Sequence, residues 1–129
     1  MANTDAQRPT EGELEILSVL WSRGPSTVRA VWEELSRVRS VGYTTVLKLM
    51  QIMAEKGLVD RDERRQSHVY SARRPREHTE RLLLRDLIDR AFDGSMQKLI
   101  LRAVDSKTIT PQELAQIRAL FDSIEGGRR

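Results

Sequence analysis

Residues 41–75, VGYTTVLKLMQIMAEKGLVDRDERRQSHVYSARRP, change their hydrophobic pattern part-way, and this change decides the fold. The first half predicts a helix over residues 44–56, because its apolar residues recur on one helix face: Val46, Leu49, Met50 and Met53. Gly57 suits the left-handed position just past a helix end. Beyond it, LVDRDE and SHVYSARR alternate apolar and polar residues around RRQ, which predicts a β-hairpin.

Two more helices are predicted before this stretch. Thr10-Glu11-Gly12-Glu13 has the pattern of a capping box, with Thr as N-cap and Glu three residues later. The apolar residues that follow at helical spacing are Leu14, Leu17, Leu20 and Trp21. A second helix, starting at Ser26 or Thr27, has an apolar face of Val28, Val31, Trp32 and Leu35. Three short helices followed by a basic hairpin are the order of a winged helix-turn-helix domain.

Three amphipathic helices are predicted in the second half of the chain. The first starts after Pro75 and stops at Gly94, the second follows Ser95, and the third starts at Thr110-Pro111-Gln112-Glu113, another capping box. Fifty residues alone bury too little apolar surface for stability, whereas two copies cover each other's apolar faces. We expect a winged-helix domain at residues 1–75 and a helical dimerisation domain at residues 76–129. The expected dimer interface is Leu84, Leu87, Ile88, Leu99, Ile100, Leu120 and Phe121.

The predicted fold is therefore mainly α with a small β-hairpin, and its positive charge is concentrated in one segment. Residues 42–76 contain eight Lys and Arg against four Asp and Glu, a net charge of +4, whereas the whole chain has a formal charge of +3. A local basic patch on a winged helix indicates double-stranded DNA as the partner.

The residues expected to contact DNA lie on the third helix and on the hairpin. Thr44, Thr45 and Lys48 are placed in the major groove and Tyr43 at the backbone, because recognition helices present their first turns to the bases. Arg64, Arg65, Gln66 and Ser67 are placed on phosphate or in the minor groove. The same residues also fit a capped surface helix and a solvated charged turn, since acidic residues lie beside these arginines. A winged helix that binds a protein partner therefore remains the alternative.

Catalysis, metal binding and membrane insertion find no support in the sequence. The two histidines belong to no catalytic or metal-binding pattern, the glycines form no phosphate-binding loop, and there is no cysteine. We expect no enzyme activity, no cofactor and no metal. The first ten residues contain no apolar run, and no segment reaches the length of about 20 apolar residues that a membrane span needs. The expected location is the cytoplasm, without direct membrane contact.

Several motifs together resemble the penicillinase-repressor family of BlaI and MecI. They are TEGELEILSVLWSRGPSTVRAVWEEL, GYTTVLKLMQIMAEKGLVDRD, HVYSA, LLRDLIDRAFDGSMQKLILRAV and TPQELAQIRALFDSIE, and they span residues 10 to 125. The resemblance implies a bacterial transcriptional repressor that binds an inverted-repeat operator as a homodimer through two winged helices.

The resemblance also implies that a membrane sensor protease relieves repression by cutting the C-terminal unit. In the best-known members the cut falls at an Asn-Phe bond, and by spacing from Gly94 the corresponding bond is Arg102–Ala103. The residue types at this bond differ from those of the family. Copper-responsive relatives carry a C-terminal Cys-x-Cys motif, which a chain without cysteine lacks.

Overall fold

A computed structural model of the chain describes residues 8–127, so most of the N-terminal stretch discussed above lies outside the described residues. The chain divides into two compact units, Met1–Leu84 and Arg85–Arg129. The division falls inside the helix Arg76–Ala91, nine residues after the predicted limit at residue 75. The limits of independently folding domains stay a prediction.

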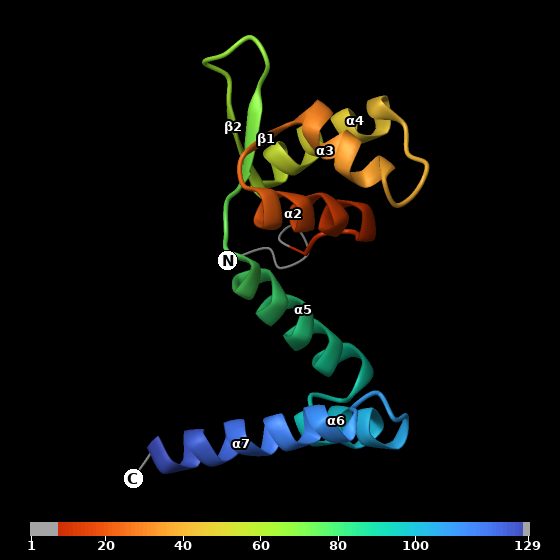
Figure 1. The fold of residues 1–129 in the computed structure, drawn as a ribbon, viewed down its shortest axis with the longest axis vertical. Coiled ribbons are helices and arrows are strands. Elements are labelled where there is room, and N and C mark those ends of the chain that lie inside the picture. Colours follow the sequence, from red (N-terminus) through yellow and green to blue (C-terminus); the bar gives the residue numbers. More distant parts are fainter. Residues whose placement is uncertain (1–7, 128–129) are drawn as a thin grey trace. The chain divides into compact units, whose positions relative to one another are not determined.

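Residues 8–75 of the first unit form three helices and a small sheet (Figure 1). In chain order its elements are α2 (Glu11–Arg23), β1 (Ser26–Thr27), α3 (Val28–Ser36), α4 (Tyr43–Lys56), β2 (Val59–Asp62) and β3 (Val69–Ala72). The sheet is antiparallel with β3 in the middle, where Tyr70 faces Ser26 of β1 and Arg61 of β2. Strand β1 was not predicted, because two residues are too short to show an alternating pattern.

The two predicted capping boxes and the predicted end of the third helix are confirmed, whereas α4 begins one residue earlier than predicted, at Tyr43. The hydroxyl of Thr10 accepts a hydrogen bond from the Glu13 N–H at 3.3 Å, and the Glu13 carboxylate accepts one from the Thr10 N–H at 2.9 Å. Thr110 and Glu113 form the same reciprocal pair. Helix α4 ends at Gly57, whose φ of 83° is the left-handed conformation expected there.

One apolar core joins the three helices to the sheet. Each helix contributes three buried side chains, and β2 and β3 contribute one each: Ile16, Leu17, Leu20, Val28, Val31, Leu35, Val46, Met50, Met53, Val59 and Tyr70. Trp21 and Trp32 are half-buried against this core, and their indole N–H groups donate to the carbonyls of Arg74 and Val41. Because the core holds the inner side of α4, the opposite side faces solvent.

The remaining helices are α5 (Arg76–Ala91), α6 (Met96–Asp105) and α7 (Pro111–Gly127). Neither α6 nor α7 has a fully buried residue within the single chain. Of the seven residues predicted for the dimer interface, only Ile88 is buried, with 6% of its surface exposed. Leu84, Leu87, Ile100, Leu120 and Phe121 are exposed by 38–59%, so the apolar faces of these helices are not covered by their own chain.

Candidate nucleic-acid interface

The solvent side of α4 carries the residues predicted to read DNA. Tyr43, Thr44, Thr45 and Lys48 are all exposed, whereas Val46, Met50 and Met53 are buried on the other side. The N-cap is Gly42, which has no side chain to bond the first N–H groups of the helix. Uncapped N–H groups at a helix N-terminus attract anions, so the start of α4 suits a phosphate.

Tyr43 is held by neighbours on α3. Its ring meets the ring of Trp32 edge-on, with 5.9 Å between the centroids. The guanidinium of Arg29 lies 5.7 Å from the Tyr43 centroid and 5.8 Å from the Trp32 centroid. The loop before α4 is tied in as well, because the Trp32 indole donates to the carbonyl of Val41 at 2.8 Å. These contacts orient the Tyr43 side chain and bring a positive charge beside it.

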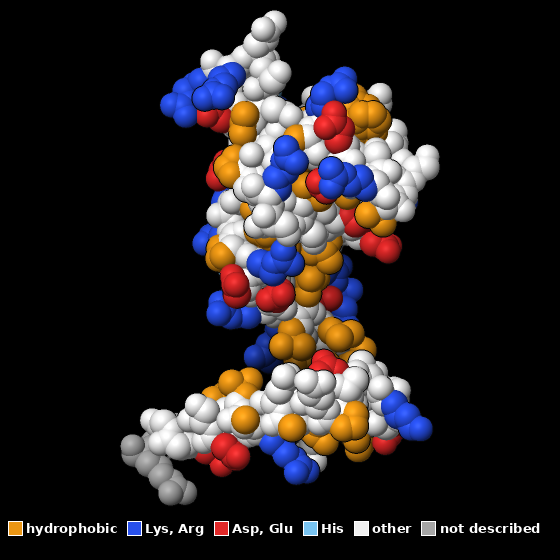
Figure 2. Space-filling model, viewed as in Figure 1, with side chains coloured by type: hydrophobic (Ala, Val, Ile, Leu, Met, Phe, Trp, Pro, Cys, Tyr) orange, Lys and Arg blue, Asp and Glu red, His pale blue; other side chains and the backbone are white. Residues whose placement is uncertain are grey.

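The arginines of the hairpin differ in how they are paired. The guanidinium of Arg64 donates two hydrogen bonds to the Asp62 carboxylate, at 2.8 and 3.0 Å, and the Arg64 N–H donates a third. These bonds hold the pKa of Asp62 well below its ordinary value. Arg61 contacts Glu63 at 2.6 Å. Figure 2 shows this mixture of basic and acidic side chains at the tip of the hairpin.

Arg65, by contrast, has no ion-pair partner among residues 8–127 and is exposed. It lies at the tip with Gln66 and Ser67, which are also exposed. The prediction treated Arg64 and Arg65 as equivalent, but the structure leaves only the Arg65 guanidinium available without breaking an existing pair.

A groove of about 400 Å³ lies between α4 and the hairpin. Its α4 wall presents Tyr43, Leu47 and Gln51, which are spaced four residues apart and therefore share one face of the helix. The remaining walls come from the start of α3 and from the hairpin: Thr27, Val28, Arg29, Arg61, Gln66, Ser67, His68 and Tyr70. The groove thus brings Tyr43, Gln66 and Ser67 together, whereas Thr44, Thr45 and Lys48 lie on α4 outside it.

Four groove residues with a basic or amide side chain are not among the predicted DNA contacts: Arg29, Gln51, Arg61 and His68. No sequence pattern distinguishes Arg29 from the other residues of its helix. Its place at this surface follows from its contact with the Tyr43 ring. Gln51 follows Tyr43 by eight residues, so the helical repeat itself was a usable signal. Arg61 and His68 belong to the same basic hairpin but face the groove instead of the tip.

Four of the eight basic residues in the segment 42–76 have no carboxylate partner in the described part of the chain. Lys56, Arg61, Arg64 and Arg73 each form an ion pair. The others are Lys48, Arg65, Arg74 and Arg76. Lys48 and Arg65 lie on α4 and at the hairpin tip, where a polyanion is expected, whereas Arg74 and Arg76 follow the far end of β3.

The predicted cleavage bond, Arg102–Ala103, lies inside helix α6. The Arg102 side chain is exposed and pairs with Asp105 at 2.9 Å, and Ala103 is half-buried. Because the bond lies inside a regular helix, a protease that binds its substrate in an extended conformation would need α6 to unwind locally first.

Residues 8–127 contain neither a metal-binding cluster nor a helix that could span a membrane. Among residues 8–127 no three His, Asp or Glu side chains gather closely enough to hold a metal ion. In the same range, no helix combines the length and the hydropathy that crossing a bilayer requires.

Comparison with known proteins connects this surface to a family. Residues 9–123 match the family model described as Penicillinase repressor. The chain is 35% identical over 122 residues to a Mycobacterium tuberculosis protein named Transcriptional regulator BlaI, covering 90% of this chain and 86% of that protein. It is 18% identical over 113 residues to the Methicillin resistance regulatory protein MecI of Mammaliicoccus sciuri, covering 88% and 92%.

The solved structure of the DNA binding domain of the repressor BlaI has the same fold as part of this chain. The match covers 59% of this chain and 90% of that domain, with a TM-score of 0.50 at 20% identity. The predicted fold class is thereby confirmed.

Proposed function

The chain belongs to the penicillinase-repressor family, and we propose that it represses transcription by binding an operator as a homodimer. Its family consists of transcriptional regulators, which agrees with the prediction that the chain is not an enzyme. The observation that carries the proposal is the exposed side of α4. There a helix N-terminus without a side-chain cap and Lys48, which has no ion-pair partner among residues 8–127, lie next to a hairpin whose tip exposes Arg65.

The proposed DNA contacts follow from this geometry. Thr44 and Thr45 contact base edges. The Thr hydroxyl can hydrogen-bond to any of several bases, and the Thr methyl group can pack on the methyl group of thymine. Lys48 and Tyr43 hold phosphates beside them. With α4 in the major groove and the hairpin over the adjacent minor groove, the strand between the two passes over the 400 Å³ groove. Gln66, Ser67 and Arg65 then reach that strand or the minor groove.

The homodimer is supported by the uncovered apolar faces of α5, α6 and α7. Leu114, Ile117, Phe121 and Ile124 follow one another at spacings of three, four and three residues, the repeat of a helix–helix seam. Three of them are exposed by 37–51%, and Leu120 beside them by 59%. Figure 2 shows apolar side chains on the surface of α6 and α7. An exposed apolar surface of this kind is typical of an interface, and a second copy presents the matching surface.

The dimer is tested by sedimentation equilibrium of the wild type and of Phe121→Glu. We expect the wild type to be a dimer and Phe121→Glu to dissociate, because a charge in an apolar seam has no partner. Gln112→Glu is the matched control, since Gln112 is exposed nine residues before Phe121, on the opposite side of α7, and its variant adds the same charge and should stay dimeric. A monomeric wild type, or equal association of all three proteins, contradicts the assignment.

Operator binding is tested by fluorescence anisotropy with DNA from upstream of the gene that encodes this protein and with scrambled DNA, at several salt concentrations. We expect selective binding that weakens with salt, because cations on the protein replace counterions on the phosphates. Equal weak binding to both DNAs would instead favour the alternative, a winged helix that recognises a protein partner.

Release of repression by proteolysis is the remaining part of the proposal. A membrane sensor protease would cut Arg102–Ala103 after local opening of α6, which separates the dimerisation surface of α7 from the DNA-binding unit. Mass spectrometry of the protein from induced cells tests this, and cleavage elsewhere or intact protein during derepression contradicts it.

A further inference from the structure

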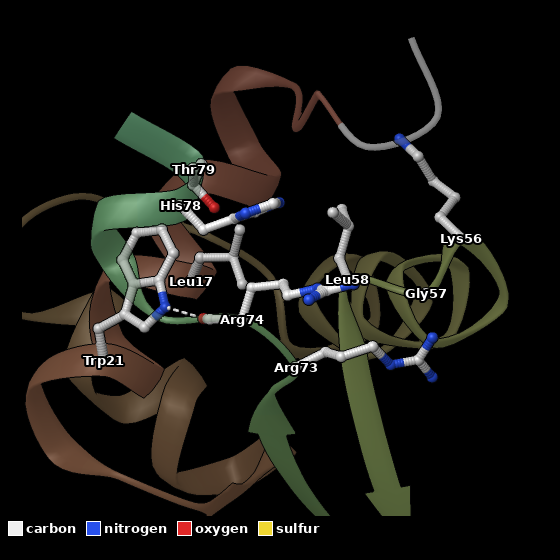
Figure 3. Close-up of a pocket in the computed structure, with 9 residues that line it drawn as sticks. All are labelled: Leu17, Trp21, Lys56, Gly57, Leu58, Arg73, Arg74, His78 and Thr79. Carbon is white, nitrogen blue, oxygen red and sulfur yellow. Dashed lines mark hydrogen bonds between the residues drawn. The ribbon is translucent and has the colours of Figure 1, made fainter. Parts of the chain in front are cut away.

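A second, smaller cavity lies in the first unit, away from the hairpin tip (Figure 3). Its volume is about 130 Å³, and its apolar floor is formed by Leu17, Trp21 and Leu58. The other lining residues are Lys56, Gly57, Arg73, Arg74, His78 and Thr79. Three cationic side chains and an imidazole therefore surround a cavity whose lining contains no carboxylate.

The four basic side chains differ in whether they already have a hydrogen-bond or ion-pair partner. Lys56 donates a hydrogen bond to the buried carboxylate of Glu13 at 2.8 Å, and Arg73 forms an ion pair with Asp60 at 2.8 Å. In Figure 3 both of these side chains extend away from the centre of the cavity. Arg74 and His78 reach across it, and neither side chain has a hydrogen-bond or ion-pair partner within residues 8–127.

Arg74 is an exposed residue whose backbone is anchored at the cavity by one hydrogen bond. The carbonyl of Arg74 accepts a hydrogen bond from the Trp21 indole at 2.9 Å. Arg76, two residues later, lies with its guanidinium 5.2 Å from the centroid of the Trp21 ring and donates to the Ser22 hydroxyl. On the facing wall, Thr79 is 5% exposed and lies one residue after His78 in the first turn of α5.

We propose that this cavity binds a small oxyanion, a phosphate or carboxylate group, held between Arg74 and His78. An unpaired guanidinium binds oxyanions with two parallel N–H donors, and imidazole adds a donor in either protonation state. The volume equals the liquid-phase share of roughly four water molecules, at about 30 Å³ each. Cavities for larger organic ligands span about 300–1,000 Å³, so a single small group fits and a bulky ligand does not.

Such a ligand joins the segment after β3 to the first turn of α5. Within the first unit it would hold the first turn of α5 against the segment after β3, and would thereby stiffen the start of the helix that leads toward the dimerisation helices. This consequence rests on the proposed operator binding, whereas the binding of the oxyanion does not.

Nuclear magnetic resonance of the full chain with inorganic phosphate tests the site. Trp21 lines the cavity and its indole N–H donates to the Arg74 carbonyl, whereas the Trp32 indole N–H donates to Val41 outside the cavity. The two resonances therefore act as probe and internal reference. We expect a saturable shift of the Trp21 resonance only, with sodium chloride at equal ionic strength as the blank. Isothermal titration calorimetry then gives the affinity.

Two cavity variants and one control complete the experiment. Arg74→Gln and His78→Gln should each weaken phosphate binding, Arg74→Gln by roughly tenfold, since it removes a charge-assisted hydrogen bond but keeps the carbonyl that Trp21 uses. Arg81→Gln removes the same charge from an exposed position on α5 outside the cavity and should bind as the wild type does. Thermal unfolding without phosphate verifies that each variant is folded.

Equal affinity of folded Arg74→Gln and wild type, or parallel unsaturable shifts of both indoles, overturns the site. A separate arm measures DNA affinity in phosphate and in chloride at equal ionic strength. If phosphate binds but changes the DNA affinity of wild type and Arg74→Gln equally, the coupling to α5 is wrong. If the chain binds no DNA, the proposed function fails while the phosphate titration still decides the cavity.

Discussion

Replacing Lys48 with alanine tests the exposed side of α4 at the residue where the expected effect is easiest to calculate. Lys48 is exposed, has no ion-pair partner in the described range and makes no core contact. Alanine is also the best helix former, so the variant should fold as the wild type does. Any change in DNA binding then reports the lost charge.

The magnitude follows from counterion release. Each phosphate contact contributes about 0.9 to the slope of log K against log salt concentration. At about 0.15 M salt this corresponds to roughly fivefold in affinity per contact, and roughly thirtyfold for a dimer that presents two copies of Lys48. Because phosphates carry no sequence information, operator and scrambled DNA should lose the same factor.

The assay is fluorescence anisotropy on both DNAs between low and high salt, at protein concentrations where the dimer is intact. The control is Lys98→Ala, which removes the same charge from α6, where Lys98 bonds Asp93 at 2.9 Å. We expect the salt slope to fall by about 1.8 for Lys48→Ala and to stay constant for the control. An unchanged slope for Lys48→Ala, or an equal fall in both variants, refutes the phosphate contact.

Three predictions concern the stability of the DNA-binding unit. Glu13→Gln should lower the free energy of unfolding by about 1–3 kcal/mol in chemical denaturation, because it removes the buried negative charge that pairs with Lys56. An unaltered denaturation midpoint would contradict that role. Gly57→Ala should lower the free energy of unfolding by about 1–2 kcal/mol, since φ is 83° and a Cβ there would lie 2.9 Å from an Arg73 guanidinium nitrogen. Thermal unfolding at neutral pH measures this loss, and a raised Tm would exclude the backbone strain. Arg39 lowers the pKa of Glu15 below its ordinary value of 4.5 through their hydrogen bonds, so the pair stabilises the fold above that value. Its contribution should disappear as the pH falls through the lowered pKa, and Arg39→Gln should differ from wild type only above that range.

The elements of the fold were predictable because their signals lie within short stretches. The helical repeat of α4 and the two capping boxes each involve residues three or four apart, which the chain brings together without tertiary help. The hairpin was recognised from alternation, whereas β1 was missed because its two residues pair with β3 over forty positions away. The apolar faces of α6 and α7 were visible from spacing, and the structure shows that their own chain does not cover them.

The sequence by itself determined the order of helices and hairpin, the basic segment and the family to which the chain belongs. Only the tertiary structure decided which cations are available, since Arg64 folds back on Asp62 while Arg65 does not. It also placed Arg29 beside Tyr43 and the Arg74 carbonyl on Trp21, 53 residues away. The reason is physical: helix and strand patterns are local, whereas ion pairs and cavities depend on distances through space that no short stretch of sequence contains.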